Sequence, residues 1–389
     1  MRKLLLIFSL SLVVAILIGV YYLTENNPTV VQSTLLLAGG PTKRASPDEF
    51  TRAISPALLE FPRDFGAHLD FQTEWWYYTG NLDTPEGRHF GYQLTFFRRA
   101  LLPPTQISPR ASDWASDQAY MAHFALTDVE GGWHQDFEHL ARGAAGLAGA
   151  QANPYRVWLE NWSVEEVAPG EYQLTARHDD LGLDLRLSDL KGPVLQGEQG
   201  YSRKGSAPGN ASYYYSQPRL ATEGTVSVTG KAYPVSGFSW KDHEYSTSAL
   251  SPDQIGWDWF SIQLDDRHEI MVFQLRREDG SIDPFSSGTV IYPDGNTRTL
   301  GKDDFTIQVE DTWRSPASGG IYPSSWTMNI PSEKLTMEIF PYLPDQEMNV
   351  SYNYWEGAVK VSGEHDGLPV GGNGYVELTG YAGSMSGEF

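Results

Sequence analysis

The chain has 389 residues, 40% of them hydrophobic and 20% charged, so it is long enough for two globular domains with separate cores. A formal net charge of −21 excludes a protein built to bind nucleic acid, because phosphate contacts need concentrated Lys and Arg. The lack of any cysteine excludes disulfides, thiolate catalysis, Cys-ligated zinc and iron–sulfur clusters.

The first feature along the chain is an uncharged apolar run at residues 4–23, which follows Arg2 and Lys3. The length of this run suits a single membrane-spanning helix, and the positive charges before it favour export of everything after it. We therefore expect residues 1–25 to be a membrane anchor or a signal peptide, with a retained anchor favoured. Residues 26–60, rich in Thr, Asn, Ser and Pro, are expected to be a linker. The expected location is the bacterial cell envelope, periplasmic or otherwise outside the cytoplasm.

From Phe61 onward the sequence consists of short runs rich in Trp, Tyr, Phe and Val. Gly, Pro, Asn and Asp interrupt these runs roughly every 8–15 residues, which is typical of an all-β sandwich or barrel. No segment after residue 30 carries a sustained apolar stripe at helical spacing, so helices should be few and short. The expected strands lie at 74–82, 89–99, 119–128, 172–178, 182–189, 224–230, 269–277, 326–331, 335–341, 357–363 and 374–383.

Two stretches of the chain echo each other. WWYYTGNLD, beginning at Trp75, and WDWFSIQLD, beginning at Trp257, are both strands that open on Trp and end in Leu-Asp. Each is followed by an Arg-His turn, at Arg88 and Arg267, and then by a Gln-containing strand that closes on Arg-Arg. Matched hairpins so far apart predict a duplicated β-barrel unit, and an eight-stranded barrel encloses a cavity of ligand size.

Several motifs rich in Trp, Tyr and Gly run through the chain: TEWWYYTGNL, FGYQLTFFRR, SYYYSQPRL, VSGFSWKDHEYS, GWDWFSIQL, DQEMNVSYNYWEGAVKVSG and GYVELTGY. Over about residues 58–383 they resemble the AttH-like family, related to the carotenoid 1,2-hydratases in the lipocalin-like superfamily. The resemblance implies an all-β fold of two tandem lipocalin-like (calycin) antiparallel barrels. We expect an N-terminal lipocalin-like domain at 61–245 and a C-terminal one at 246–389.

The resemblance also implies a range of functions. Family members include hydratases that add water to an isoprenoid end-group alkene, fungal relatives that act on plant defence compounds or shape cycloadditions, and exported bacterial proteins of unassigned role. The hydratases are thought to use a His, an Asp and surrounding aromatic residues. This chain carries Tyr245 where the hydratases tend to have Trp, and Gly256 where an aromatic residue is expected. Loss of cation-facing rings would favour another substrate or no catalysis.

The densest group of proton-transfer side chains lies at 236–264, at the junction of the two expected barrels. Hydrating an alkene needs a proton donor, a surface for a tertiary cation and a positioned water. A carboxylic acid in an apolar pocket keeps its proton near neutral pH, and aromatic faces stabilise cations. Asp258 is the predicted acid, and His243 with Tyr245 is predicted to handle the water. Asp242 is a fourth catalytic candidate.

The candidate ligand-binding residues surround these four in the sequence or follow the barrel wall: Trp240, Trp257, Trp259, Glu244 and Tyr214. No cofactor and no metal site are predicted. Asp242-His243-Glu244 offers possible metal ligands, but no second His follows at helical spacing, so the zinc-protease pattern is absent.

Strand geometry divides these candidates between two faces, because alternate residues of a strand point the same way. Trp240, Asp242 and Glu244 should face one side of their strand. Lys241, His243 and Tyr245 should face the other, so they cannot all line one cavity unless a bulge intervenes. Asp258 shares its face with apolar residues, which would bury it, and a buried aspartate must be protonated or paired.

Structural roles are the alternatives. Asp242, His243 and Glu244 could tie the two barrels together by hydrogen bonds, and Asp258 could pair with a buried Arg. Glu74-Trp75-Trp76 is interpreted as closing one end of the first barrel.

The leading hypothesis is an exported double lipocalin that binds an apolar, isoprenoid or lipid-like small molecule and hydrates or isomerises it by acid catalysis. The alternative is a non-catalytic carrier or envelope-associated binding protein on the same scaffold. The expected partners are this small molecule and, through residues 4–23, a membrane.

Overall fold

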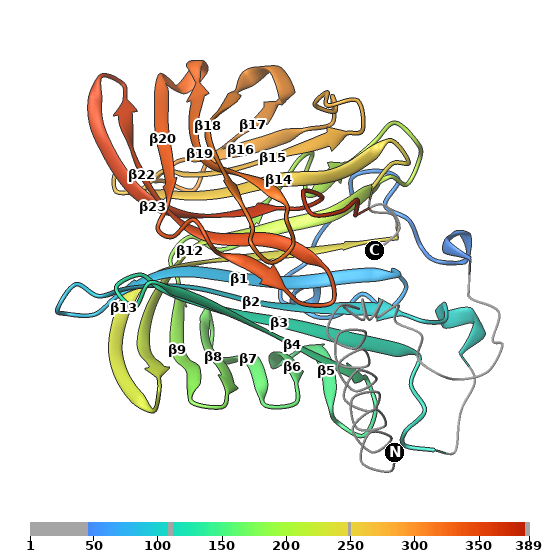
Figure 1. The fold of residues 1–389 in the computed structure, drawn as a ribbon. Coiled ribbons are helices and arrows are strands. Elements are labelled where there is room, and N and C mark those ends of the chain that lie inside the picture. The colour runs from blue at the N-terminus through green and yellow to red at the C-terminus, as the bar shows by residue number, and fades with distance from the viewer. Residues whose placement is uncertain (1–45, 108–111, 248–249, 386–389) are drawn as a thin grey trace, which may run out of the picture. The chain divides into compact units, whose positions relative to one another are not determined.

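The computed structural model describes residues 46–107, 112–247 and 250–385, which belong to one compact unit, Lys43–Phe389 (Figure 1). The expected anchor or signal at residues 1–25 lies outside the described residues, as does the greater part of the expected linker. Within the described ranges, no helix has the length and apolar character needed to cross a membrane.

The first sheet has 13 antiparallel strands and curls into a nearly closed barrel (Figure 1). Its strands are β1 (Thr73–Asp83), β2 (His89–Ala100), β3 (Gln118–Asp128), β4 (Trp133–Arg142), β5 (Ala148–Ala152), β6 (Tyr155–Leu159), β7 (Trp162–Ala168), β8 (Glu171–His178), β9 (Leu181–Asp189), β10 (Val194–Leu195), β11 (Tyr201–Arg203), β12 (Ala211–Val228) and β13 (Lys231–Ser246). They run in the order β4-β3-β2-β1-β13-β12-β9-β8-β7-β6-β5, while β10 and β11 pair with β12 off this path.

The second sheet has 10 antiparallel strands and forms a half-barrel (Figure 1). Its strands are β14 (Gln254–Leu264), β15 (Glu269–Arg277), β16 (Ser287–Ile291), β17 (Thr297–Gly301), β18 (Thr306–Arg314), β19 (Ile321–Ile330), β20 (Leu335–Pro341), β21 (Glu347–Asn349), β22 (Asn353–His365) and β23 (Leu368–Leu378). They run in the order β17-β16-β15-β14-β23-β22-β20-β19-β18, with β21 pairing with β22. The fold is thus the expected pair of lipocalin-like antiparallel barrels.

Helical structure in the described ranges is limited to short 3-10 turns, as the sequence pattern predicts. These turns are η1 (Pro47–Glu49), η2 (Arg63–Phe65), η3 (Pro104–Gln106), η4 (Lys302–Asp304) and η5 (Pro331–Glu333).

The echo in the sequence corresponds to hairpins at equivalent places in the two sheets. β1 pairs with β2 on one side and with β13 on the other. β14 likewise pairs with β15 on one side and with β23 on the other. In each sheet the Trp-opened strand is therefore bonded to the following strand and to the last strand of the same sheet.

The three largest apolar clusters of the described residues lie one inside each barrel and a third where the two sheets face each other. β1 contributes to two of them, because Trp76 and Tyr78 point into the first barrel while Tyr77 points toward the second sheet. β14 does the same, with Phe260 inside the second barrel and Trp259 in the third cluster. Because both faces of these strands are buried, their apolar side chains occur on both faces rather than only at alternate positions.

Candidate functional site

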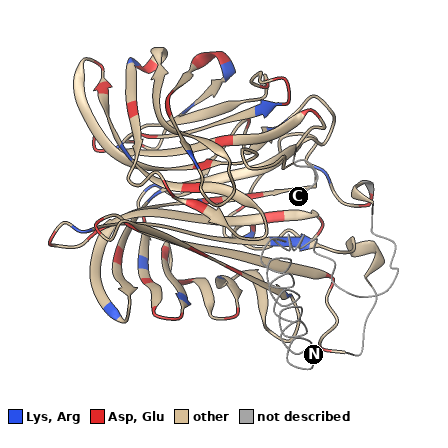
Figure 2. Ribbon diagram, in the orientation of Figure 1, with Lys and Arg blue, Asp and Glu red and all other residues tan. Residues whose placement is uncertain are grey.

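A pocket lies between the two sheets, and we call it the seam pocket. Acidic residues occur on strands of both sheets (Figure 2), and four of them line this pocket. Among the residues that line it, aromatic rings come from both sheets: Trp75, Tyr77, Tyr214, Trp257, Trp259 and Phe273. The charged residues of the lining are Asp242, Glu244, Glu356, Glu377 and Lys204.

The two faces of β13 are used as strand alternation predicts. Asp242 and Glu244 line the seam pocket, and Trp240 lies behind them in the third apolar cluster. His243 points the other way and packs on Trp76 inside the first barrel, with ring centroids 4.8 Å apart. The predicted acid–base candidates of this strand are therefore separated by the strand itself.

Asp242 is held by three donors. The Tyr214 hydroxyl donates to Oδ2 at 2.6 Å and Trp240 Nε1 donates to Oδ1 at 2.7 Å, while Ser216 donates to Oδ1 as well. Burial raises the pKa of Asp242 to about 7, although these hydrogen bonds oppose the shift. Because both carboxyl oxygens already accept hydrogen bonds, Asp242 is better placed to fix the pocket wall than to give up a proton.

Glu244 and Lys204 form the ion pair of the pocket. Lys204 Nζ lies 3.2 Å from Glu244 Oε1 and 4.0 Å from the centroid of the Phe273 ring. Ser212 also donates a hydrogen bond to Glu244. The pair places one positive charge in a pocket that is otherwise acidic and aromatic.

Glu356 and Glu377 face each other directly across β22 and β23. Cross-strand neighbours of this kind have Cβ atoms about 4.5–5.5 Å apart, so the two carboxyl groups interact. The Tyr77 hydroxyl donates to Glu356 Oε2 at 2.8 Å, and Trp257 Nε1 donates to Glu377 Oε2 at 2.8 Å. We call these two residues the carboxyl pair.

The pocket favours one shared proton on the carboxyl pair. Burial raises the pKa of Glu356 well above its usual range, and the negative charge of Glu377 raises it further. Burial also raises the pKa of Glu377, to about 7, although the Trp257 hydrogen bond opposes the shift. Of the two, Glu356 is the member whose surroundings favour the protonated form, and it lies beside Glu377, which the shift to about 7 leaves partly ionised at neutral pH.

Sequence reasoning missed the carboxyl pair. Each residue is the single charged residue of a short local stretch, NYWEGAV for Glu356 and GYVELTG for Glu377. An isolated carboxylate in such a stretch could have marked each residue as a site candidate. The pairing of Glu356 with Glu377, however, follows from strand register, which the sequence does not reveal.

His243 belongs to a buried polar network at one end of the first barrel. Its Nε2 donates to Glu74 Oε1 at 2.8 Å, and its Nδ1 accepts from the Tyr215 hydroxyl at 2.9 Å. Burial lowers the pKa of His243 to about 4, so the ring is neutral at pH 7. Arg98 Nε donates to Glu74 Oε2 at 2.7 Å, and His68 Nδ1 lies 2.7 Å from Glu74 Oε1.

This network could in principle hold a metal ion, because His68, Glu74 and His243 offer ligand atoms within 4.8 Å of one another. Hydrogen bonds already account for both ring nitrogens of His243 and of His68, whose Nε2 lies 3.2 Å from Asp64. The guanidinium of Arg98 adds a positive charge that repels a cation. The arrangement is better explained as structural.

Stability should depend on pH through His68 of this network. Burial lowers the pKa of His68, but hydrogen bonds to Asp64 and Glu74 outweigh that effect and raise it from 6.5 to about 9. The stabilisation is therefore fully present below pH 6.5 and is lost as the pH rises through 9. We expect the difference in unfolding free energy between wild type and His68→Gln to shrink by about 3 kcal/mol over this window.

Urea denaturation at several pH values measures this difference. Lys241, whose pKa burial lowers to about 7, makes stability rise with pH above 7, but it does so in both proteins and cancels. A difference that stays constant from pH 6 to pH 10 would contradict the assignment.

Asp258 lies on the opposite face of β14 from the two tryptophans that flank it. Arg276 Nε donates to Asp258 Oδ1 at 2.9 Å, and the Tyr381 hydroxyl donates to Oδ2 at 3.0 Å. Burial raises the pKa of Asp258, although Arg276 opposes the shift. Asp258 thus has the Arg partner that the structural alternative anticipates.

Tyr245 lies at the first barrel. Its ring stacks on His68 with centroids 3.5 Å apart, and it packs in a small cluster with Phe71 and Ala53. Ala53 belongs to the expected linker, so part of that segment packs against the barrel. Of the predicted site residues, the seam pocket brings together Asp242, Glu244, Tyr214, Trp257 and Trp259, and its lining does not include Trp240, His243, Tyr245 or Asp258.

Comparison with known proteins identifies the family. A solved structure of a protein described as AttH from Nitrosomonas europaea is 38% identical, with a TM-score of 0.76, and the match covers 85% of this chain and 100% of that chain. Kievitone hydratase from Nectria haematococca is 15% identical with a TM-score of 0.65, covering 88% of this chain and 98% of that one. CghA is 12% identical with a TM-score of 0.51, covering 87% and 98%. These two share the fold.

No curated protein sequence matches the chain. The AttH-like family model matches residues 52–381, which include both sheets and every residue of the seam pocket. The chain therefore belongs to the AttH-like family.

Proposed function

We propose that this protein binds an apolar, isoprenoid-like molecule in the seam pocket and adds water to one of its alkenes by acid catalysis. The observation that carries the proposal is Glu356, a buried carboxyl group that lies among aromatic rings and whose raised pKa favours its protonated form. A buried carboxylic acid with a raised pKa can act as a general acid near neutral pH.

The proton balance uses both members of the carboxyl pair. Glu356 gives its proton to the less substituted alkene carbon, and the alkene π electrons form the new C–H bond, leaving a tertiary cation. A water oxygen donates an electron pair to that cation and loses a proton to the Glu377 carboxylate. One proton then passes from Glu377 to Glu356 across the strand pair, so the net reaction adds one water to one alkene.

The aromatic lining suits the cationic intermediate. Trp257 and Trp259 from one sheet and Trp75 and Tyr77 from the other present rings to the same space. A ring face stabilises a nearby cation by about 0.5–2 kcal/mol, more when water is excluded. On the first-sheet side of the pocket, the ionised form of Asp242 would add negative potential, while Glu244 is paired with Lys204.

The shared fold with a hydratase, kievitone hydratase, is consistent with the proposal, although one scaffold can carry many activities. The proposal includes export from the cytoplasm, which the apolar run at residues 4–23 supports. A carrier on the same scaffold would use the pocket without consuming the alkene, so the two functions differ in their product.

The test uses the full chain, a panel of acyclic isoprenoids of increasing length with squalene as the longest, and water enriched in ¹⁸O. We expect mass spectrometry to find a tertiary alcohol carrying ¹⁸O, formed only when protein is present. Squalane, the saturated counterpart of squalene, should bind but remain unchanged. Binding of the whole panel without any alcohol would overturn acid catalysis and leave the carrier function.

The rate should show a bell-shaped dependence on pH. Hydration needs Glu377 ionised and Glu356 protonated, so kcat/KM should rise as the pH passes about 7 and fall at higher pH when Glu356 loses its proton. In Glu377→Gln the rising limb should disappear while the falling limb remains. A rising limb unchanged in this variant would contradict the role of Glu377.

A further inference from the structure

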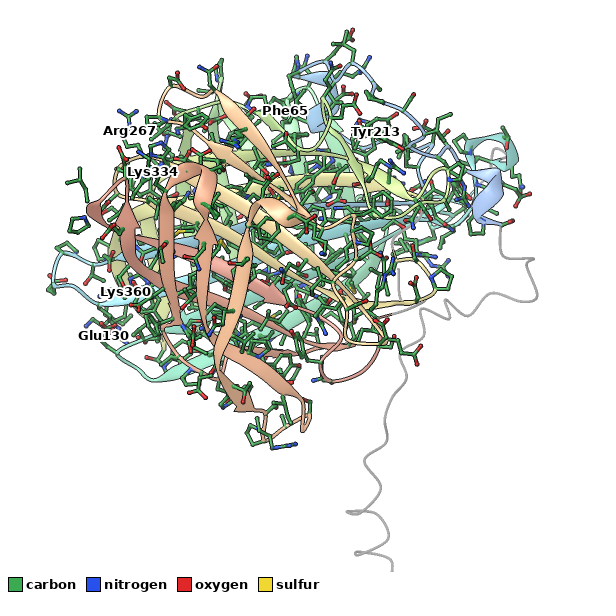
Figure 3. All side chains as sticks on the ribbon, turned by 90° about the horizontal axis from the view of Figure 1, so that it is seen from above. Phe65, Glu130, Tyr213, Arg267, Lys334 and Lys360 are labelled. Carbon is green, nitrogen blue, oxygen red and sulfur yellow. The ribbon has the colours of Figure 1, made fainter. Side chains whose placement is uncertain are left out.

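Two neighbouring hairpin turns bring together two histidines and an aspartate far from the seam pocket. Asp266 and His268 lie in the turn between β14 and β15, and His365 ends β22 just before the turn into β23. The turns are adjacent because β14 pairs with β23. Figure 3 labels Arg267, which belongs to the first turn, toward the rim of the molecule.

The three side chains converge on one point. His365 Nδ1 lies 2.6 Å from Asp266 Oδ2, and His268 Nδ1 lies 3.0 Å from Asp266 Oδ1. The two imidazole rings have centroids 4.6 Å apart and are nearly perpendicular. One ligand atom from each residue lies within 4.8 Å of the other two. Ligands of a tetrahedral zinc, with bonds of about 2.0–2.1 Å, are about 3.3 Å apart, so small side-chain rotations suffice.

Hydrogen bonding within the cluster is incomplete. His268 Nδ1 is buried and lies 3.0 Å from Asp266 Oδ1, but its geometry does not meet that of a hydrogen bond. A metal ion between the two groups would replace this poorly aligned contact with a direct bond to each. The other two-histidine cluster, at Glu74, has partners for all of its ring nitrogens.

We propose that Asp266, His268 and His365 bind a divalent transition metal, with Zn²⁺ the best match. Two imidazoles and one carboxylate are a zinc ligand set, and three protein ligands leave at least one position for water or a further ligand. The His365 side chain is 17% exposed and that of Asp266 33%, so an ion can reach the site from solvent. Metal binding would replace the hydrogen bond between His365 Nδ1 and Asp266 Oδ2.

The surrounding charges are compatible with a cation. Asp265 lies next to Asp266 and accepts a hydrogen bond from Gly371. Two amines near these turns are paired with other carboxylates: Lys191 with Glu269 at 2.6 Å and Lys334 with Asp366 at 2.5 Å. Arg267, between Asp266 and His268 in the sequence, is the positive charge that belongs to the turn itself.

The metal would act as a clamp rather than as part of the proposed hydration. Glu377 and the start of β23 at Leu368 are nine residues apart, about 30 Å along the strand at roughly 3.3 Å per residue. A metal bound here joins the β14–β15 and β22–β23 turns of the half-barrel and stabilises the folded state by mass action.

Co²⁺ absorption and Zn²⁺-dependent melting of the full chain, first stripped with a chelator, test the site. We expect the wild type to show visible Co²⁺ bands of a low-coordinate site and a higher Tm with Zn²⁺. His365→Ala and Asp266→Asn should each weaken Zn²⁺ binding by more than about tenfold. His139→Ala removes a histidine of similar exposure that pairs with a single carboxylate, and it should keep the wild-type affinity.

The absence of Co²⁺ bands and of any Zn²⁺-dependent rise in Tm in the wild type would overturn the proposal. So would wild-type affinity in both His365→Ala and Asp266→Asn, because the metal would then bind elsewhere. Neither readout depends on turnover, so failure here is separable from failure of the proposed hydration.

Discussion

Replacing Glu356 by glutamine is expected to lower the rate of hydration by about 10²–10⁴-fold, the usual contribution of a positioned general acid. Glutamine keeps the size of the side chain and can still accept the hydrogen bond from Tyr77, but it has no acidic proton to give. The alkene then has no strong proton donor in the seam pocket. Single-turnover measurement of the ¹⁸O-labelled alcohol reports the change.

Two variants make this result interpretable. Glu338→Gln makes the same chemical change on β20, at an exposed position outside the pocket, and should leave the rate unchanged. Asp258→Asn tests the acid expected from the sequence, which the structure pairs with Arg276. If Asp258→Asn abolished hydration while Glu356→Gln preserved it, the acid would be Asp258 and the role of the carboxyl pair would be wrong.

Replacing Glu74 by glutamine is expected to lower the free energy of unfolding by about 3–5 kcal/mol, because it leaves the buried guanidinium of Arg98 without a counter-charge. Both side chains are fully buried, and Arg98 also donates to the carbonyl oxygens of His68 and Phe71, which hold it in place. The charge of Arg98 cannot move to solvent. Urea denaturation measures the loss.

The matched control is an ion pair of the same type at the surface. Arg186 and Glu171 pair with side chains 49% and 37% exposed, so Glu171→Gln should cost less than about 1 kcal/mol. If the two variants lost equal amounts of unfolding free energy, burial of the Glu74–Arg98 pair would not increase its contribution to stability, and the prediction would be contradicted.

Much of the fold could be predicted because its signals are local. The turn residues, the aromatic strands and the repeated hairpins at Trp75 and Trp257 correspond to β1–β2 and β14–β15. Strand alternation also predicts correctly which side chains of β13 face the same way. The contact between the two sheets, however, depends on which strands carry apolar residues on their outer face as well as inside the barrel. Tyr77 and Trp259 are such residues, and their contact can be recognised only when both sheets are in place.

The site was harder to predict because its parts come from distant strands. The high density of charged residues at 236–264 predicts a functional site in this stretch, and Asp242 and Glu244 do line the pocket. His243 was a natural candidate by residue type, but its partner, Glu74, lies 169 residues earlier in the chain and turns it into a member of a buried network. Glu356 and Glu377 act as a pair only through the register of β22 and β23.

The central claim is that the seam pocket holds a neutral carboxyl group at neutral pH, and infrared spectroscopy tests it without a substrate. The difference spectrum between wild type and Glu356→Gln at pH 7 should contain the C=O band of a protonated carboxylic acid, and this band should shift in D₂O. If the difference spectrum instead shows only the bands of an ionised carboxylate, Glu356 is not protonated and acid catalysis from this pocket is contradicted.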